Sequence, residues 1–289
     1  MADLQKKLYI SFEVFAFLVR LVPRSVAGVI GQGLGLLAYY LLPERRKTAV
    51  KNVALCPNLP PQIKAESLAK ASFANMGLMG AEFIRFYSMS KAEILSRVEI
   101  VGREHLDRAL KKGKGVVFIS AHLGNWELMG MALVLAGYPI SPLVKTQKNS
   151  FFDQYINEKR RSLGMKPVAT GFSLRQVMKA LKENRVVNFM MDQNAGKYGV
   201  KNEFLGRAAS TPRGAAAVAR KTGATVIPGY IIRVGPWRHR ITILPEVEVI
   251  NDHQEEDIVS NTNRFSGYIE EMVLTAPEQW MWMHHRWGK

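Results

Sequence analysis

The sequence predicts an α/β fold: a central mixed β-sheet flanked by helices, with an N-terminal helical segment that associates with a membrane. Two observations lead to this prediction. From about residue 96 onward, short runs rich in Val and Ile alternate with stretches in which apolar residues recur every three or four positions. This alternation is typical of a sheet covered by helices. The first 42 residues instead hold two long apolar runs between basic residues.

The elements follow one another without an internal repeat or a low-complexity linker. Strands are expected at residues 97–101, 115–120, 139–144, 185–191, 224–233 and 239–249. Helices are expected at 103–112, 125–137, 150–163, 173–183, 212–222 and 255–276, and the apolar spacing over 63–87 predicts one long amphipathic helix. We therefore expect two parts: an N-terminal foot (residues 1–42) and one catalytic domain (residues 43–289).

The foot contains apolar runs at residues 8–22 and 26–42. The first run carries Glu13 and Arg20, which argue against a deep span, whereas the second has no formal charge. As a helix, the second run is about 25 Å long, a little short of the ~30 Å hydrocarbon core of a bilayer. We expect a helix pair that lies in, or dips into, one leaflet; a pair of buried core helices is the alternative. The flanking basic residues are Lys6, Lys7, Arg20, Arg24, Arg45, Arg46, Lys47 and Lys51.

Gly31, Gly33 and Gly35 lie within the second apolar run. Their spacing is not that of a nucleotide-binding loop, and no predicted strand precedes them. We expect them to allow close packing between helices.

The charge balance favours an anionic partner. Forty Lys and Arg residues stand against 24 Asp and Glu, a formal net charge of +16. A field of this sign attracts nucleic acid, an anionic membrane or an acidic protein. The sequence has no helix-turn-helix, zinc-finger or RNP-like pattern, so we do not expect nucleic-acid binding. Cys56 is the single cysteine, which excludes an internal disulfide and is typical of a small buried apolar residue.

The candidate active site lies in residues 115–130, which read GVVFISAHLGNWELMG. An apolar strand ends before His122, and helical spacing resumes at Trp126. Asn125 is a favourable N-cap residue for that helix. Since ligands of open α/β sheets bind beyond the carboxyl ends of the strands, His122 is placed where a substrate is expected.

His122 and Glu127 form an H-x4-E pattern. Positions five apart on one helix point about 140° apart, so the two side chains meet only if His122 precedes the helix and Glu127 lies in its first turn. A neutral imidazole can accept the proton of an attacking hydroxyl, and a carboxylate on its other nitrogen fixes the tautomer. No G-x-S-x-G motif is present, so we expect the acceptor hydroxyl itself to attack, without an acyl-enzyme. Ser120 is a less favoured nucleophile, and a structural loop histidine is the non-catalytic alternative.

Six stretches in this order resemble the lipid A biosynthesis late acyltransferases, the lauroyl and myristoyl transferases within the H-x4-D/E glycerolipid acyltransferase superfamily. The stretches are GLGLLAYYLLPERRKTAVKNVALCPN, ISAHLGNWELMG, RRSLGM, VVNFMMDQN, FLGRAASTPRGAAAVARKTGATVIP and APEQWMWMHHRW. The resemblance implies a glycerolipid-acyltransferase-like fold and transfer of an acyl chain from acyl carrier protein, or acyl-CoA, to a hydroxyl of a lipid A precursor. It also implies the cytoplasmic face of the bacterial inner membrane, an anionic membrane partner, and neither a metal nor a cofactor.

The resemblance further implies roles for single residues. His122 is the base, Glu127 its orienting partner, and Arg160 and Asp192 match family positions at the substrate site. Asn125 and Arg213 complete the predicted substrate-binding set.

The residues themselves leave alternatives open. Arg160 suits a phosphate or a plain solvated face, and Asp192 is equally typical of a turn. Arg213 opens a helix whose N-terminus can hold an anion, although Thr211 as a simple N-cap, with Pro212 at the first helical position, explains the same pattern. The adjacent histidines near the end of the chain, His284 and His285, lack the cluster of a metal site.

Four other functions remain open at the level of sequence. The acceptor can be another glycolipid or a lysophospholipid, and the same dyad can use water as a thioesterase. A membrane scaffold without catalysis and a nucleic-acid binder are the alternatives that are not enzymes.

Overall fold

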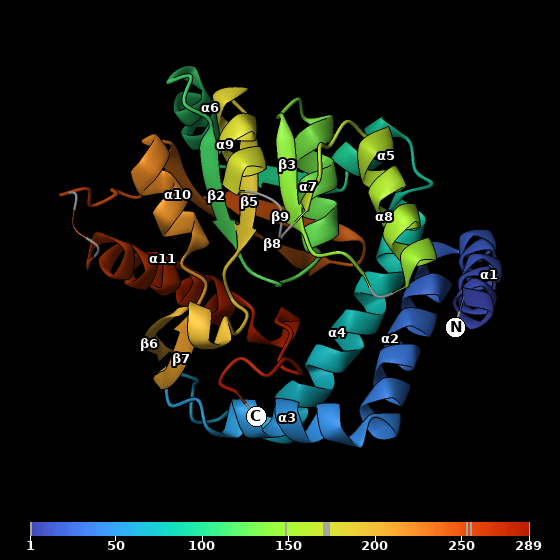
Figure 1. The fold of residues 1–289 in the computed structure, drawn as a ribbon. Coiled ribbons are helices and arrows are strands. Elements are labelled where there is room, and N and C mark those ends of the chain that lie inside the picture. The colour runs from blue at the N-terminus through green and yellow to red at the C-terminus, as the bar shows by residue number, and fades with distance from the viewer. Residues whose placement is uncertain (1, 148, 170–173, 253, 255, 289) are drawn as a thin grey trace.

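The computed structural model describes residues 2–147, 149–169, 174–252, 254 and 256–288, with the side chains of residues 2–5 left out (Figure 1). Within these residues lies a seven-stranded sheet with the order β1-β9-β8-β2-β5-β3-β4. Strands β8, β2, β5, β3 and β4 run parallel; β9 is antiparallel to β8, and β1 is parallel to β9. The predicted mixed sheet flanked by helices is confirmed. The strands are β1 (Val98–Val101), β2 (Val116–Ser120), β3 (Ile140–Val144), β4 (Val168–Ala169), β5 (Val186–Met190), β6 (Val200–Phe204), β7 (Arg207–Thr211), β8 (Thr225–Gly235) and β9 (Arg238–Ile243).

Helices precede the sheet and connect its strands. The N-terminal layer consists of α1 (Ala2–Leu21), α2 (Arg24–Leu41), α3 (Pro43–Ala54) and α4 (Ala65–Phe86). The body contains α5 (Lys91–Leu95), α6 (Arg103–Lys111), α7 (Trp126–Leu135), α8 (Ser150–Ser162), α9 (Leu174–Lys182), α10 (Gly214–Thr222) and α11 (Glu256–Thr275), with short 3-10 turns η1 (Gly196–Tyr198) and η2 (Pro277–Gln279). The predicted starts of two helices, at residues 173 and 255, lie outside the described residues.

Apolar side chains alternate along the central strand β2 and are buried on both faces of the sheet. Val117 and Ile119 join the core formed with α9, α10 and α11. Val116 and Phe118 join the core formed with α6 and α7. A sheet covered on both sides reads as continuous apolar runs, and this is why the sequence pattern located β2 and β5.

One predicted helix start was wrong. Thr211 is not an N-cap but the last residue of β7, which pairs with β6 in a hairpin that the sequence pattern did not predict. The Thr211 hydroxyl donates to Oδ1 of Asn202 and accepts from the Arg286 guanidinium, so it does not cap a helix. Helix α10 therefore begins at Gly214, with Arg213 at its N-cap position.

Close packing between α2 and α4 confirms the role predicted for two of the foot glycines. A Cβ on Gly31 would lie 2.7 Å from the carbonyl oxygen of Gly77, and one on Gly35 would overlap the carbonyl of Phe73. Gly33 meets nothing within 4 Å and is not part of this contact. The second apolar run of the foot therefore packs through its glycines directly on the backbone of α4.

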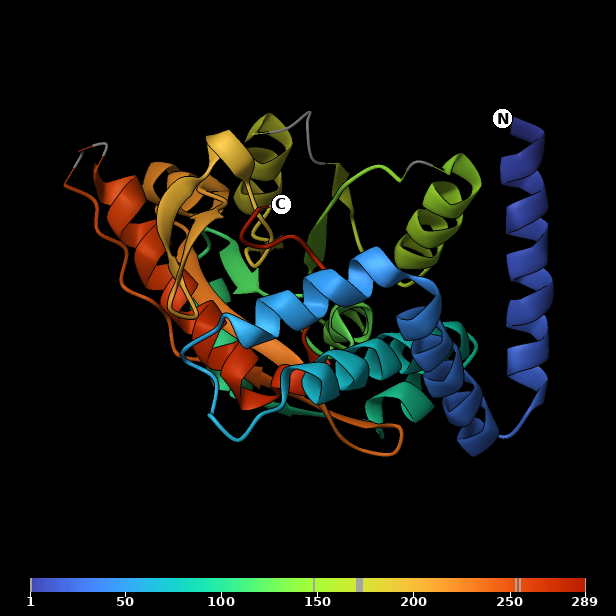
Figure 2. The same ribbon diagram turned by 90° about the horizontal axis from the view of Figure 1, so that it is seen from below.

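Helix α1 stands at the edge of the molecule, beside α8 (Figure 2). Among the described residues no single helix is long and apolar enough to cross a membrane. The bent pair of α2 and α3, which meet at 94°, passes that test together on length and composition.

Candidate functional site

The loop after β2 presents His122 at the carboxyl end of the sheet. As the spacing predicted, His122 stands before the helix, and Glu127 lies in the first turn of α7. Gly124 in this loop has φ +59°, and a Cβ there would overlap the carbonyl oxygen of Ile231. Only glycine therefore lets the loop pass this close to β8. The Trp126 ring meets the His122 ring edge-on at 5.0 Å and covers one side of it.

Asp192 holds His122 in a single orientation. It follows β5, the sheet neighbour of β2, so both residues leave adjacent parallel strands at the same edge. One carboxylate oxygen lies 2.8 Å from Nδ1 of His122, and the other accepts the His122 backbone N–H at 2.9 Å. With Nδ1 protonated against Asp192, Nε2 of the neutral ring is left as the proton acceptor.

Burial and charge act in opposite directions on this pair. Burial alone lowers the pKa of His122, but the charge of Asp192 and its hydrogen bond outweigh burial and leave the pKa above its ordinary value of 6.5. Burial raises the pKa of Asp192, yet attraction to His122 and the hydrogen bonds from His122 and Trp280 lower it to about 2. Asp192 is therefore ionised at neutral pH and stabilises the imidazolium that proton abstraction produces.

Glu127 is not the partner of His122 in the structure, which corrects the role that the sequence assigned to it. Its two carboxylate oxygens accept from Nη2 and Nε of Arg160, the latter at 3.2 Å. Arg160, on α8, also donates to Oδ1 of Asn157 at 3.2 Å. The charge of Glu127 still acts on His122 and favours its protonated form. The sequence located Glu127 correctly but not its ion pair, because the position of α8 over α7 is a tertiary feature.

Asn125 caps α7 as predicted, but its amide does not face a substrate. Its Oδ1 accepts the Leu128 backbone N–H at 3.0 Å, and its Nδ2 donates to Glu82 at 3.0 Å in a fully buried position. Glu82 in turn binds Arg233 through two hydrogen bonds and lies 3.2 Å from His239. Asn125 thus connects the start of α7 to a buried polar network on α4, and both ends of its amide are occupied by these contacts.

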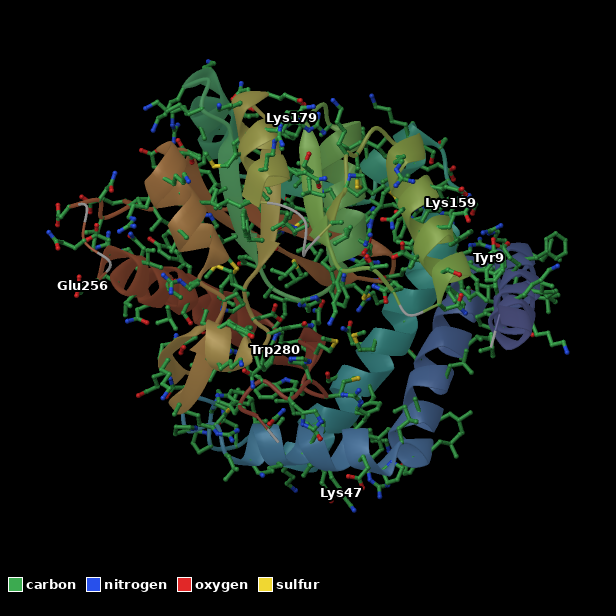
Figure 3. All side chains as sticks on the ribbon, in the orientation of Figure 1. Tyr9, Lys47, Lys159, Lys179, Glu256 and Trp280 are labelled. Carbon is green, nitrogen blue, oxygen red and sulfur yellow. The ribbon has the colours of Figure 1, made fainter. Side chains whose placement is uncertain are left out.

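A segment near the C-terminus holds the loops of the dyad through hydrogen bonds, and its Trp280 is labelled in Figure 3. Trp280 Nε1 donates to Asp192 at 2.8 Å. The Gly124 N–H donates to the Gln279 carbonyl at 3.1 Å, and Leu123 forms an isolated antiparallel β-bridge with Trp280. Three side chains of the N-terminal layer in turn hold the backbone of this C-terminal segment (residues 279–286): Asn52 binds the carbonyls of Trp282 and His284, Ser72 that of Trp280, and Asn75 that of Gln279. This aromatic segment therefore carries hydrogen bonds of the site as well as packing on the body.

An apolar cavity of about 560 Å³ opens beside the dyad, between the N-terminal layer and helices α7 and α8. Trp126 and Glu127 are among the residues that line it. Its walls combine aromatic rings, methionines and bare helix backbone, from Phe12, Phe15, Phe73, Met76, Met79, Phe83, Phe152, Tyr155, Ile156, Met283, Gly31, Gly35, Gly77 and Gly80 among others. A cavity of this size and lining suits a flexible apolar ligand.

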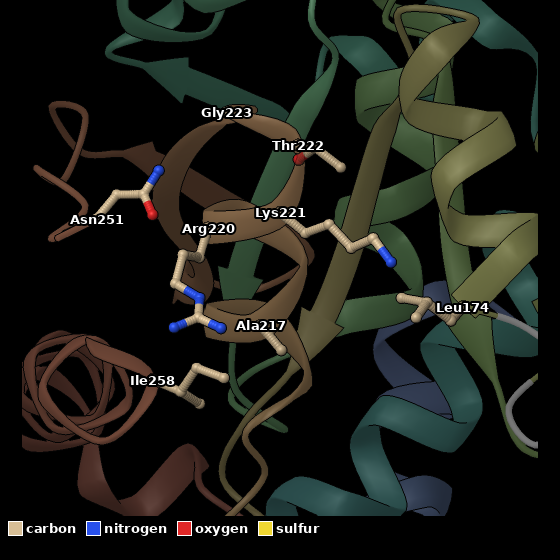
Figure 4. A pocket seen from close by; sticks show the side chains of 8 residues that line it. All are labelled: Leu174, Ala217, Arg220, Lys221, Thr222, Gly223, Asn251 and Ile258. Atoms are coloured by element: carbon tan, nitrogen blue, oxygen red, sulfur yellow. The ribbon is translucent and has the colours of Figure 1, made fainter. Parts of the chain in front are cut away.

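Arg213 is exposed at the start of α10 and does not line this cavity. A second cavity, of about 610 Å³, lies at the other end of α10, where Arg220, Lys221, Asn251 and Leu174 surround it (Figure 4). None of the predicted site residues lines it. The structure thus gathers His122, Glu127, Asn125, Arg160 and Asp192 around one loop and one cavity, and leaves Arg213 apart from that cavity. Among the described residues, no group of three or more His, Cys, Asp or Glu side chains is placed to hold a metal ion.

Ser120 is buried, and its hydroxyl donates to Oδ1 of Asn188 at 2.7 Å. Ser120 is thus not aimed at the dyad, and a dyad next to an apolar cavity suits activation of a substrate hydroxyl. The sequence model described as "Bacterial lipid A biosynthesis acyltransferase" matches residues 5–289. The chain belongs to this family. It is an acyltransferase, and the resemblance noted in the sequence is confirmed.

Curated relatives of this acyltransferase differ in their acceptors. The phosphatidylinositol mannoside acyltransferase of Mycolicibacterium smegmatis is 27% identical over 93% of this chain and 88% of its own length. The lipid A biosynthesis lauroyltransferase of Escherichia coli is 26% identical over 93% of this chain and 88% of its own length. The lipid A biosynthesis palmitoleoyltransferase of the same organism is 24% identical over 92% of this chain and 86% of its own length. The class of reaction is shared across these relatives, whereas the glycolipid is not.

Proposed function

We propose that this enzyme moves a fatty acyl chain from acyl carrier protein to a hydroxyl of a lipid A precursor, at the cytoplasmic face of the bacterial inner membrane. The observation that carries the proposal is the dyad itself: Asp192 fixes Nδ1 of His122, which leaves Nε2 to accept a proton beside an apolar cavity. The lipid A relatives and the basic charge of the chain, which attracts an acidic carrier protein, support the choice of partners.

The reaction follows from this geometry. The acceptor hydroxyl attacks the thioester carbonyl carbon and forms the C–O bond while Nε2 of His122 takes its proton. Asp192 stabilises the resulting imidazolium. When the tetrahedral intermediate collapses, the C–S bond breaks, and the imidazolium returns the proton to the departing thiolate. The products are an ester and the free thiol of the carrier, and no acyl-enzyme forms.

The acyl chain occupies the apolar cavity in this proposal. Trp126 lines the cavity and contacts the His122 ring, so a chain in the cavity can place its carbonyl near Nε2. Glu127 also lines the cavity and pairs with Arg160. The Glu127 side chain is 16% exposed and that of Arg160 is 14% exposed, so both can meet a polar headgroup. A guanidinium of this kind is suited to phosphate through paired hydrogen bonds.

The N-terminal layer provides the membrane contact. Helices α1 and α2 expose apolar side chains that are each at least half accessible, including Val14, Phe17, Leu21, Val29, Leu37 and Leu41. Beside them, α3 presents the basic side chains of Arg45, Lys47 and Lys51 to solvent. Apolar surface next to basic side chains binds an anionic interface. Sedimentation with anionic vesicles tests this contact. We expect the wild-type enzyme to sediment with the vesicles and the double variant Phe17→Glu/Leu21→Glu to remain in the supernatant. If the wild-type enzyme sediments equally well with neutral vesicles, the basic side chains do not contribute to binding.

The decisive assay offers one acyl donor to several acceptors. Purified enzyme in detergent receives acyl carrier protein charged with a labelled acyl chain, together with a lipid A precursor, a phosphatidylinositol mannoside, a lysophospholipid or no acceptor. We expect transfer to the lipid A precursor, and its loss in His122→Ala. The phosphatidylinositol mannoside is the second candidate acceptor because of the Mycolicibacterium relative. If the enzyme prefers it, the proposed acceptor is wrong but the proposed mechanism stands. Equal release of free fatty acid without acceptor identifies a thioesterase.

A further inference from the structure

The loop that carries Asp192 also places a second side chain on the catalytic histidine. Gln193 Nε2 lies 3.4 Å from Nε2 of His122, the nitrogen opposite the one held by Asp192. Because Nδ1 carries the proton that Asp192 accepts, Nε2 of the neutral ring is an acceptor and the Gln193 amide is the donor. The amide therefore rests where an acceptor hydroxyl must bind to give up its proton.

Hydrogen bonds hold the loop around Gln193 at three consecutive residues, through the side chains of Asp192 and Asn194 and the carbonyl of Gln193. Asp192 is held by His122 and Trp280, as described above. The carbonyl of Gln193 accepts from Arg286 at 3.5 Å, and Arg286 is fully buried and also donates to the Ser210 carbonyl at 2.7 Å. Nδ2 of Asn194 donates to the His285 carbonyl at 3.3 Å. The freedom that remains in this loop is thus in the side chain of Gln193, which is partly exposed.

Acyl transfer requires a hydrogen-bond donor that the dyad does not supply. As the hydroxyl attacks, the thioester carbonyl oxygen becomes an oxyanion, and donors aimed at that oxygen lower the barrier. The attacking oxygen sits about 3 Å from Nε2, and the carbonyl it attacks about 3 Å further on. A hydroxyl that takes the place of the Gln193 amide on Nε2 leaves this amide one small side-chain rotation from the carbonyl oxygen.

We propose that Gln193 is a catalytic residue whose side-chain amide donates a hydrogen bond to the oxyanion formed from the acyl donor. In the empty site the amide rests on Nε2 of His122, and substrate binding transfers it to the carbonyl oxygen. The inference rests on the proposed acyl transfer. It assigns to this residue a contact with the reacting atoms that neither His122 nor Asp192 makes.

The test compares Gln193→Ala and the isosteric Gln193→Glu with wild type in the acyl carrier protein assay. Loss of one oxyanion donor is expected to lower kcat by roughly 10²- to 10³-fold, with little change in KM and in the temperature of unfolding. Gln193→Glu should be at least as impaired, since an ionised carboxylate cannot donate and repels the oxyanion. Gln154→Ala, an exposed glutamine-to-alanine change on α8, serves as the matched control with unchanged activity.

The pH profile separates a catalytic role from a positioning role. The Gln193 N–H stabilises unprotonated Nε2, so its removal raises the pKa of His122 and moves the rising limb of kcat/KM to higher pH. Asp192, Glu127 and His284 also act on His122 and are unchanged in the variants. The proposal expects the loss of kcat to persist on the high-pH plateau. Recovery there, or near-native kcat in either variant, overturns it. Absence of transfer by wild type to any acceptor refutes the proposed function instead.

Discussion

Two carboxylates flank the catalytic histidine, and they differ in what encloses them. Asp192 is 2% exposed and accepts hydrogen bonds from the His122 backbone, the imidazole and Trp280. Glu127 is 16% exposed, lines the apolar cavity and pairs with Arg160. The first is buried among its hydrogen-bond donors, whereas the second lines the apolar cavity.

This difference separates two tasks that a short sequence motif combines. A carboxylate enclosed by fixed donors keeps one geometry and serves to orient the imidazole. A carboxylate that shares an arginine at a cavity wall can release that arginine to a ligand. We infer that Asp192 supports the chemistry and Glu127 supports binding, and four substitutions test the division.

Asp192→Asn is expected to have the largest effect. An amide can stabilise the wrong tautomer of His122 and cannot stabilise the imidazolium, so kcat should fall roughly 10³- to 10⁴-fold. Wild-type kcat/KM should rise with pH through a pKa above 6.5. In the variant, loss of the negative charge lowers the pKa of His122 and moves that limb to lower pH. Asp252→Asn, at an exposed position, is the control. If the rising limb of kcat/KM in Asp192→Asn stays at its wild-type pH, the pairing of Asp192 with His122 is contradicted.

Glu82→Gln extends the comparison to an enclosed carboxylate remote from substrate. Burial raises the pKa of Glu82, but the hydrogen bonds from Arg233 and the nearby His239 ring lower it to about 2. Breaking such a buried pair should lower the free energy of unfolding by about 3–5 kcal/mol at neutral pH. The pKa of Glu82 is lower in the folded protein than its ordinary value of 4.5. This contribution to stability is therefore fully present above about pH 4.5 and is lost as the pH falls toward 2. Denaturant unfolding should therefore show wild type and variant converging in acid; a constant difference argues against the ion pair.

Glu127→Gln removes the partner of Arg160 but leaves the His122–Asp192 pair intact. Loss of hydrogen bonds to a charged group is worth about 1.5–3 kcal/mol, or roughly 10- to 150-fold in kcat/KM. We expect the change mainly in KM for the acceptor. If Glu127 acts instead on the imidazole, kcat falls as in Asp192→Asn. If Glu127 acts in binding, as we infer, a double-mutant cycle with Arg160→Lys should show strong coupling to Glu127 and weak coupling to Asp192.

Trp280→Phe removes one of the donors to Asp192 and keeps an aromatic ring. Since His122 still holds the carboxylate, we expect a cost of about 1–1.5 kcal/mol, roughly 5- to 12-fold in kcat, with unchanged KM. The pKa of Asp192 should rise, because the indole hydrogen bond contributes to its depression. A larger effect on KM than on kcat places Trp280 in binding rather than in orientation.

The sequence located the reactive loop but not the neighbours of its residues. Local patterns suffice for β2, the Asn125 cap and the first turn of α7, because each depends on residues close in sequence. Asp192 lies 70 residues from His122, and only the pairing of β5 with β2 brings them together. Its position directly after a strand was a usable signal, since the carboxyl ends of parallel strands share one edge.

The remaining errors have the same origin. The Glu127–Arg160 pair needs the placement of α8, and the burial of Asn125 needs Glu82 on α4. The hairpin of β6 and β7 lacks long apolar runs and was read as loop and helix start. Gln193 was quoted within a motif but carried no signal of its own, because an amide is chemically ordinary until its neighbour is known.

Because residues 279–286 complete the hydrogen bonds around the dyad, we expect the enzyme to become active only after they have been synthesised. Residues 279–286 hold the loops of the dyad and are themselves held by Asn52, Ser72 and Asn75. A ribosome delivers the chain from its N-terminus, and contacts between distant residues close last. The α/β layers can fold around β2 and β5 earlier, but the partners of Asp192 are incomplete until Trp280 has emerged. Acyl transfer therefore requires residues 279–286 to have been synthesised, because a nascent chain without them lacks the Trp280 hydrogen bond to Asp192.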